Sequence, residues 1–185
     1  MMLAEDFNAR YYDKEILNLA AQESGFSKEF FEQNDERHGF LHSLSLARLT
    51  HLTDNSFYQS NFSQESLFKF QSDAIIKAAQ ESSCVFVGRC ADYVLRGFPN
   101  VVNIFITASL EARAALFMKE KGVGHDEAVK RIEHIESRRA SYYNYYTGKK
   151  WGHAASYDLC VDSSILGAEE TARLIAEFIH KRFKI

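Results

Sequence analysis

The stretch Val85-Phe86-Val87-Gly88-Arg89-Cys90-Ala91-Asp92 decides how this chain is expected to fold. An apolar run typical of a buried strand ends there in a glycine, an arginine and an aspartate. In an open parallel sheet, ligands collect at the carboxyl ends of the strands. Gly88 would allow close approach of a backbone, while Arg89 and Asp92 would point into the crevice. The stretch therefore predicts a strand tip that binds a polar or anionic small molecule.

Composition favours one compact domain, residues 1–185, that binds a small molecule. The chain has 185 residues, 46% of them hydrophobic, and no Pro-, Gly- or Ser-rich linker divides it. Its formal net charge of -3 gives no general attraction to nucleic acid or to an anionic membrane. The first residues do not resemble a signal peptide, and no apolar run reaches membrane-spanning length. We therefore expect a cytoplasmic protein without a nucleic-acid or membrane partner.

Cysteine and histidine indicate neither a disulfide framework nor a metal site. The three cysteines are an odd number, and Cys84 and Cys160 stand in apolar runs, where cysteine usually acts as a small buried hydrophobe. His38 and His42 are four residues apart, but no neighbouring motif completes a zinc site. We therefore predict no metal ligands.

Strand-like and helix-like segments alternate along the chain. Strands are expected over 8–12, 84–87, 101–108 and 157–161, and helices over 15–24, from 27, from 63 to about 84 with Ser63 as cap, over 110–121 with Ser109 and Gly122 as caps, over 126–143 and over 168–183. This alternation implies parallel strands with right-handed crossovers, in a three-layer α/β arrangement. The segment 39–62 is either a helical insert, which would cover an acceptor substrate, or a plain surface connection.

Two strand tips carry side chains that suit a nucleotide. An arginine offers a planar fork to phosphate and a carboxylate accepts hydrogen bonds from an amino group of a base, so Arg89 with Asp92 suits a nucleotide. The alternative is an internal ion pair between these two side chains, which needs no ligand. Asp13 and Lys14 form the second tip, where Asp13 would cap the next helix, with or without an added contact to substrate.

The segment 136–152, which we call the lid-like segment, combines cations with aromatic rings. It contains Arg138, Arg139, Lys149 and Lys150 together with four tyrosines and a tryptophan. Cations that close over a transferring phosphoryl group stabilise its spread charge, while the rings would exclude water or pack on the core. The alternative is a solvated, lightly basic helix end, because arginine and lysine favour helix C-termini in any case. Arg113 is a further cation at this end of the sheet, although a lone helical arginine is usually a surface residue.

In chain order, several motifs resemble the cytidylate-kinase-like family. They are Tyr12-Asp13-Lys14-Glu15, Val87-Gly88-Arg89-Cys90-Ala91-Asp92, Ser109-Leu110-Glu111-Ala112-Arg113-Ala114, Arg138 with Arg139, and Tyr157-Asp158-Leu159-Cys160-Val161-Asp162-Ser163. The resemblance covers nearly the whole chain. It implies a P-loop phosphotransferase fold and transfer of the γ-phosphoryl group of ATP, with Mg²⁺, to a nucleoside monophosphate such as CMP or dCMP.

The resemblance also implies roles for individual residues. The acceptor nucleotide would be held by Asp13, Lys14, Arg89 and Asp92, Arg113 would lie on the ATP side, and Arg138, Arg139 and Lys149 would be catalytic residues of the lid. Cytidylate kinases have more regularly spaced arginines in the lid, where this chain has tyrosines. Either Lys149 and Lys150 replace some of these cations or the acceptor differs.

One part of the family pattern is not found in this sequence. The family opens with a strand and a glycine-rich P-loop that holds the ATP phosphates, whereas no GxxxxGK[ST] motif occurs here. Residues 3–7 already resemble the end of the helix that follows the loop, so roughly fifteen to twenty residues are expected to be missing. The missing strand would be central, so the remaining strands would close up, borrow a strand or stay partly open. Without the cradle, the chain alone is expected to be inactive.

Three hypotheses follow. The leading one is a nucleotide kinase whose printed chain starts too late. The alternative is a non-catalytic nucleotide-binding or regulatory module that keeps the acceptor pocket without binding ATP. A purely structural partner protein is the third, if the exposed seam forms a stable homodimer interface.

Overall fold

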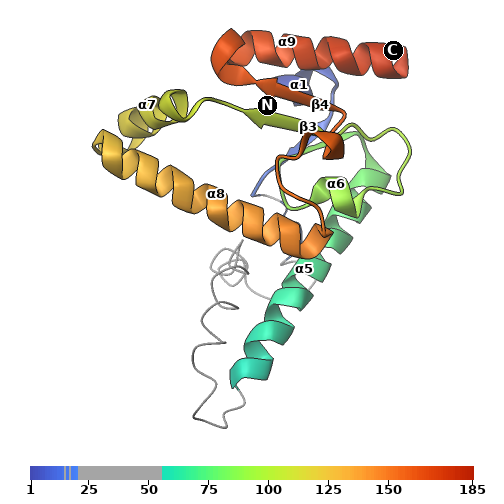
Figure 1. Cartoon of the computed structure of the whole chain (residues 1–185). Coiled ribbons are helices and arrows are strands. Elements are labelled where there is room, and N and C mark those ends of the chain that lie inside the picture. The colour runs from blue at the N-terminus through green and yellow to red at the C-terminus, as the bar shows by residue number, and fades with distance from the viewer. Residues whose placement is uncertain (15, 17, 21–55) are drawn as a thin grey trace.

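The computed structural model describes residues 1–14, 16, 18–20 and 56–185, with only the backbone described for 56–63 (Figure 1). Residues 16 and 18–20 are helical, and Ile16 and Ala20 are buried, in agreement with the helix expected after the first strand. The remainder of that helix, the helix expected from residue 27 and the segment 39–55 lie outside the described residues.

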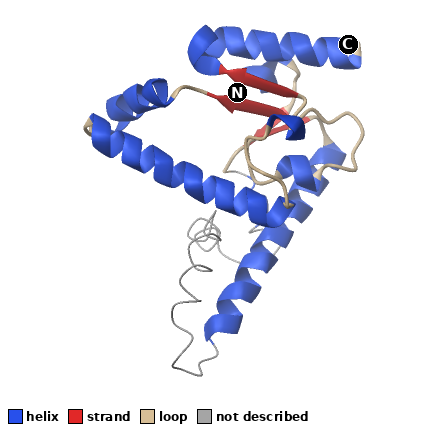
Figure 2. Ribbon diagram, viewed as in Figure 1, coloured by secondary structure: helices blue, strands red, loops and turns tan. Residues whose placement is uncertain are grey.

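Four short strands form two separate parallel pairs (Figure 2). β1 (Arg10–Tyr12) pairs with β2 (Cys84–Phe86), with Arg10 opposite Cys84. β3 (Ile104–Thr107) pairs with β4 (Leu159–Asp162), with Ile104 opposite Leu159. The predicted parallel direction is confirmed, but within the described residues β2 and β3 do not pair with each other. The strands therefore stay apart rather than closing into one sheet.

Helices lie on both sides of these strands, as expected for the α/β class. They are α1 (Met2–Asp6), α5 (Ser56–Glu81), α6 (Ala91–Val94), α7 (Leu110–Lys121), α8 (His125–Thr147), the 3₁₀ turn η1 (Ala154–Ser156) and α9 (Ser163–Phe183). Helices α1 and α9 contact each other on one side, while α5, α6 and α8 lie on the other (Figure 1). The described part of the chain contains no helix long and apolar enough to cross a membrane.

Helix α7 has the predicted bounds and caps. The Ser109 hydroxyl accepts a hydrogen bond from the Ala112 amide at 3.2 Å, and Gly122 ends the helix with φ of 66°. The prediction that Ser63 starts a helix was wrong, because α5 begins at Ser56. Residues 56–62 contain no glycine or proline that would stop a helix, so the helix continues through Ser63.

The ends of two other helices are set by glycines. Helix α8 continues past its predicted end at residue 143 and ends at Thr147. Gly148, with φ of 67°, is its left-handed C-cap. Helix α9 begins at Ser163 but is interrupted at Gly167, whose φ and ψ are 78° and 171°. The predicted start at residue 168 therefore corresponds to the part of α9 after the break.

Three buried clusters hold these elements together. The largest joins α5 to α6 and to the helical residues after β1, and comprises Ile16, Ala20, Leu67, Ala74, Ile75 and Leu95. A second joins the turn before α6 to α8 through Cys90, Tyr142 and Tyr143. The third joins α7 to α8 through Ala114, Ala128 and Ile132. As a result α8 is held at its start by α7 and at its end by the segment that follows β2.

Candidate functional site

The turn between β2 and α6 has an unusual backbone. Gly88, Arg89 and Cys90 have φ values of 72°, 58° and 54°, so three consecutive residues are left-handed. This conformation costs roughly 1–2 kcal/mol for each residue with a side chain. Residues held in such conformations cluster at functional sites, where the surrounding packing maintains them. The turn is thus a structural reason to place a site where the sequence predicted a strand tip.

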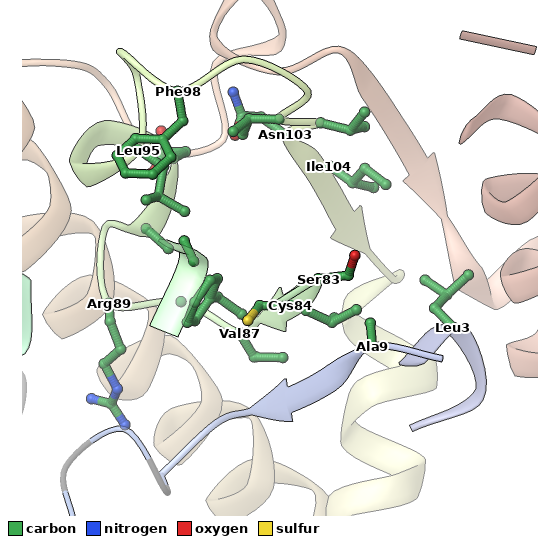
Figure 3. Close-up of a pocket in the computed structure, with 18 of the residues that line it drawn as sticks. Leu3, Ala9, Ser83, Cys84, Val87, Arg89, Leu95, Phe98, Asn103 and Ile104 are labelled. Carbon is green, nitrogen blue, oxygen red and sulfur yellow. The ribbon is translucent and has the colours of Figure 1, made fainter. Parts of the chain in front are cut away.

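Packing around the turn fixes the direction of the Arg89 side chain. Arg89 and Cys90 are both buried, with exposed fractions of 8% and 4%. The Arg89 side chain points away from Leu95 and toward the chain that follows β1 (Figure 3). The Arg89 side chain is therefore brought toward the strand tip of Asp13 and Lys14.

A cavity of about 1210 Å³ lies between the strand pairs and includes both predicted strand tips. It exceeds the roughly 300–1,000 Å³ common for small-molecule sites. Five of the eight predicted site residues line it, namely Asp13, Lys14, Arg89, Asp92 and Arg139. Apolar side chains of β2 and β3 also line the cavity, together with Val87, which follows β2 (Figure 3). The cavity lining thus combines charged side chains with apolar ones.

Asp92 is engaged by two groups from the lid-like segment. The Tyr143 hydroxyl donates a hydrogen bond to Asp92 Oδ2 at 2.7 Å. Lys149 Nζ lies 3.7 Å from the same oxygen, and the Asp92 side chain is 13% exposed. Asp92 thus forms an ion pair with Lys149, which follows the C-terminal end of α8. Lys149, which is not among the cavity-lining residues, is thereby connected to Asp92, which is one of them.

Tyr143 is a site residue that sequence reasoning did not single out. Burial is the main cause that raises the pKa of its phenol, and the hydrogen bond to Asp92 raises it further. Its hydroxyl therefore stays protonated and able to donate. Tyr143 follows Arg139 by four positions on α8, and both line the cavity. This helical spacing is the signal in the sequence that would have pointed to Tyr143.

The aromatic rings of the lid-like segment pack onto the body of the protein. Tyr142 and Tyr143 are buried, and Tyr146 stacks on Phe68 of α5 with ring centroids 3.9 Å apart. Trp151 packs edge-on against Phe105 of β3 at 5.4 Å. The interpretation of this segment as a solvated helix end is wrong for its aromatic face, because these contacts remove the rings from water.

Its two arginines occupy different surroundings. Arg139 is exposed and lines the cavity, whereas Arg138 is half-buried and is not among the lining residues. Arg139 is thus the arginine of this segment that the fold places beside the predicted acceptor residues.

Arg113 joins two helices away from the cavity. Its Nε donates to the Ala108 carbonyl at 3.0 Å, and its Nη1 donates to Glu136 Oε1 of α8 at 2.5 Å. The two side chains are 31% and 36% exposed, so this is a partly buried ion pair rather than the solvated surface arginine weighed above. Arg113 ties the start of α7 to α8.

Metal-binding geometry is not found in the described part of the chain. Nowhere in it do three His, Cys, Asp or Glu side chains converge to hold an ion. Mg²⁺ in nucleotide enzymes usually keeps several waters and binds substrate phosphates with one or two carboxylates.

Comparison with known proteins adds a family assignment. The sequence model of the cytidylate kinase-like family matches residues 1–165. A cytidylate kinase from Methanopyrus kandleri is 29% identical over 107 residues, which cover 54% of this chain and 55% of that protein. One from Pyrobaculum calidifontis is 27% identical over 104 residues, or 56% of each chain. The chain thus spans about half the length of the curated relatives it matches.

A solved structure has the same fold. The crystal structure of an uncharacterized protein from Eubacterium ventriosum superimposes with a TM-score of 0.71 and 24% sequence identity. The match covers 97% of this chain and 88% of that one. At 24% sequence identity, this comparison shows a shared fold and nothing about activity.

Proposed function

Because the chain belongs to the cytidylate kinase-like family, we propose that it is the acceptor-binding part of a nucleotide kinase. The kinase transfers the γ-phosphoryl group of ATP to a nucleoside monophosphate, with CMP or dCMP as acceptor. The observation that carries the proposal is that Asp13, Lys14, Arg89, Asp92 and Arg139 all line one cavity, beside a left-handed turn. ATP brings Mg²⁺ with its phosphates, in keeping with the family.

The charged side chains that line the cavity suit a monophosphate. The guanidinium of Arg89 forms a bidentate contact with the acceptor phosphate, and Lys14 adds a second positive charge. Asp92 uses Oδ2 for Tyr143 and Lys149, so Oδ1 accepts from the ligand. The amino group of cytosine is a donor, whereas uracil has a carbonyl oxygen at that position. This carboxylate therefore favours CMP over UMP.

The lid-like segment supplies positive charge during the reaction. Phosphoryl transfer depends mainly on positioning and on neutralising the charge of the transferring group. Arg139 already lines the cavity, and we assign it the contact with that group. Arg138 and Lys149 support it from the same segment. Arg113 contributes on the ATP side only after it leaves Glu136.

The phosphate cradle for ATP lies outside these 185 residues in our proposal. No GxxxxGK[ST] motif occurs in them, and the strand and glycine-rich loop that precede the family's first helix would supply it. The open strand edges support this view. The Val87 amide donates to the Tyr12 carbonyl at 2.8 Å, so backbone groups of the neighbouring Phe86 point away from β1 and toward the cavity.

The backbone groups of successive residues also alternate in direction along β3, on the other side of the cavity. The Asn103 carbonyl accepts from the amides that precede and begin β4, so the backbone groups of Ile104 point away from β4. One extended segment, parallel to β2 and β3, would pair with both edges. Its side chains would be apolar on both faces, because α1 and α9 lie on one side of it and α6 on the other.

An enzyme assay tests the proposal. The 185-residue chain and an N-terminally extended form are incubated with ATP and Mg²⁺ and with CMP, dCMP, UMP or AMP. We expect the extended form to phosphorylate CMP and dCMP, and the shorter chain to be inactive. Arg89→Ala should abolish activity, whereas Arg96→Ala, a change at an exposed arginine stacked on Tyr93, should not. A folded extended form that phosphorylates none of the acceptors would refute the kinase proposal.

A non-catalytic nucleotide-binding module is the second candidate. It is favoured by the presence of a charged cavity in a chain without the ATP-binding motif. Calorimetry separates the two candidates. Two results together would support the module. The chain would bind CMP and lose this binding in Arg89→Ala, and the extended form would neither bind ATP nor phosphorylate an acceptor. Sedimentation analysis addresses the third candidate, in which a second copy of the chain covers the open strand edges as a homodimer.

A further inference from the structure

We infer that Tyr143 is a positioning residue for the acceptor site, which orients the Asp92 carboxylate and thereby sets the preference for a base with an amino group. The inference rests on the proposed function. It assigns Tyr143 no contact with the reacting atoms. Its effect is exerted through Asp92.

Tyr143 is held in place by packing of its side chain and by a hydrogen bond to its backbone. Its side chain is 7% exposed and packs with Cys90, the last residue of the left-handed turn. Its backbone carbonyl accepts a hydrogen bond from the Thr147 hydroxyl at 2.7 Å. The hydroxyl group that donates to Asp92 therefore has a defined position. A donor held in this way limits rotation of the carboxylate that it binds.

Lys149 is connected to the same arrangement. Its amide donates to Thr147 Oγ1 at 3.0 Å, and its ammonium group lies 3.7 Å from Asp92 Oδ2. Thr147 thus links the backbone of Tyr143 to the residue that supplies the counter-charge. Within the part of the chain that the structure describes, both contacts to Asp92 fall on Oδ2, which leaves Oδ1 for the ligand.

The chemical consequence concerns selectivity between bases. A charged carboxylate with little exposure to water needs donors, and loss of the Tyr143 hydroxyl removes one and allows the group to rotate. A ligand that donates to Oδ1 then loses a well-placed acceptor, while a ligand held only through its phosphate does not. Hydrogen bonds to charged groups are strong enough for an effect of about tenfold in affinity.

Calorimetric titration of the 185-residue chain with CMP and with UMP tests the inference. Tyr143→Phe should weaken CMP binding about tenfold and leave UMP binding nearly unchanged. Tyr145→Phe is the matched control, because Tyr145 lies on the same helix with 51% of its surface exposed, and both affinities should equal those of wild type. In Asp92→Asn, adding Tyr143→Phe should have little further effect, since the two residues act together.

The outcomes distinguish this inference from the proposed function. If the wild-type chain binds neither nucleotide, both fail. If it binds CMP and Tyr143→Phe retains the wild-type ratio of CMP to UMP affinity, only the inference fails. If Tyr143→Phe does not fold, Thr147→Val decides, because it keeps the phenol but removes the hydroxyl that bridges Tyr143 and Lys149. A wild-type affinity ratio in that variant would overturn the inference.

Discussion

At the level of single residues, the turn after β2 concentrates unusual geometry and chemistry. Gly88 tolerates φ of 72° without cost, whereas Arg89 and Cys90 adopt similar angles against their preference. Both are buried and packed, which shows what holds them there. The turn places Arg89 and Asp92 in the lining of the cavity, so its conformation decides where two predicted site residues lie.

Replacement of Gly88 measures the conformational free-energy cost of this turn. A Cβ added at Gly88 would meet nothing within 4 Å in the described part of the chain, so the penalty of Gly88→Ala is conformational only. We expect the free energy of unfolding in urea to fall by about 1–2 kcal/mol. Gly97→Ala is the control, since the added Cβ is equally uncrowded and no left-handed φ is required. Equal stability of the two variants would contradict the prediction.

At the level of elements, α7 and α8 form an antiparallel unit that carries the lid-like segment. Ala114, Ala128 and Ile132 pack between them, and Arg113 bridges to Glu136. The end of α8 carries Arg139 and Tyr143 to the cavity, so the contacts with α7 help to position the helix that bears them.

The cap of α7 allows a direct test of its start. Ser109→Ala removes the acceptor for the Ala112 amide and should lower the unfolding free energy by about 1 kcal/mol. Ser137→Ala, at an exposed position inside α8, should be neutral or slightly stabilising because alanine has the higher helix propensity. Chemical denaturation of the two variants provides the comparison, and an Ser109→Ala protein as stable as Ser137→Ala would exclude a role for the cap.

The connection between the two helices should respond to pH. Hydrogen bonds to Glu111, at 3.1 Å, and to Asp126 raise the pKa of His125 above its ordinary value. A raised pKa in the folded state means that the stabilisation is complete below the unfolded pKa of about 6.5 and is lost as pH rises through the folded value. His125→Gln should therefore lower stability at acidic pH and have little effect at alkaline pH. If the difference in thermal unfolding temperature between wild type and His125→Gln did not change with pH, this prediction would be contradicted.

At the level of the whole molecule, the two strand pairs face a common cavity. Cys84 and Phe86 of β2 and Ile104 of β3 line it, and the backbone groups of alternate residues point into it. Backbone groups in such a position need a partner, either water or another strand.

Hydrogen exchange can detect these edges residue by residue. In the 185-residue chain, the Val87 amide, which is bonded to Tyr12, should exchange more slowly than the amides of Phe86 and Ile104. In the extended form, Phe86 and Ile104 should become protected, with Val87 as the internal reference. If the Phe86 amide were as protected as the Val87 amide in the shorter chain, the backbone groups at this edge of β2 would already have hydrogen-bond partners.

Local signals made much of the element order predictable. The Ser109 and Gly122 caps and the apolar runs that became β2 and β3 depend on neighbouring residues only. The start of α5 was missed, because a serine marks a helix start only where the preceding residues leave the helix. Contacts such as Tyr143 with Asp92 and Arg113 with Glu136 join residues 51 and 23 positions apart, and no local pattern reports them.

The amino-acid sequence was sufficient for the α/β class, for the family and for the residue types that suit a nucleotide, since these follow from short motifs and periodicity. The tertiary structure decided which of those residues meet. It placed Arg139 at the cavity, turned Arg113 toward Glu136, and paired Lys149 with Asp92. The reason is that α8 crosses from α7 to α6, and the packing of its tyrosines determines where each charged side chain lies.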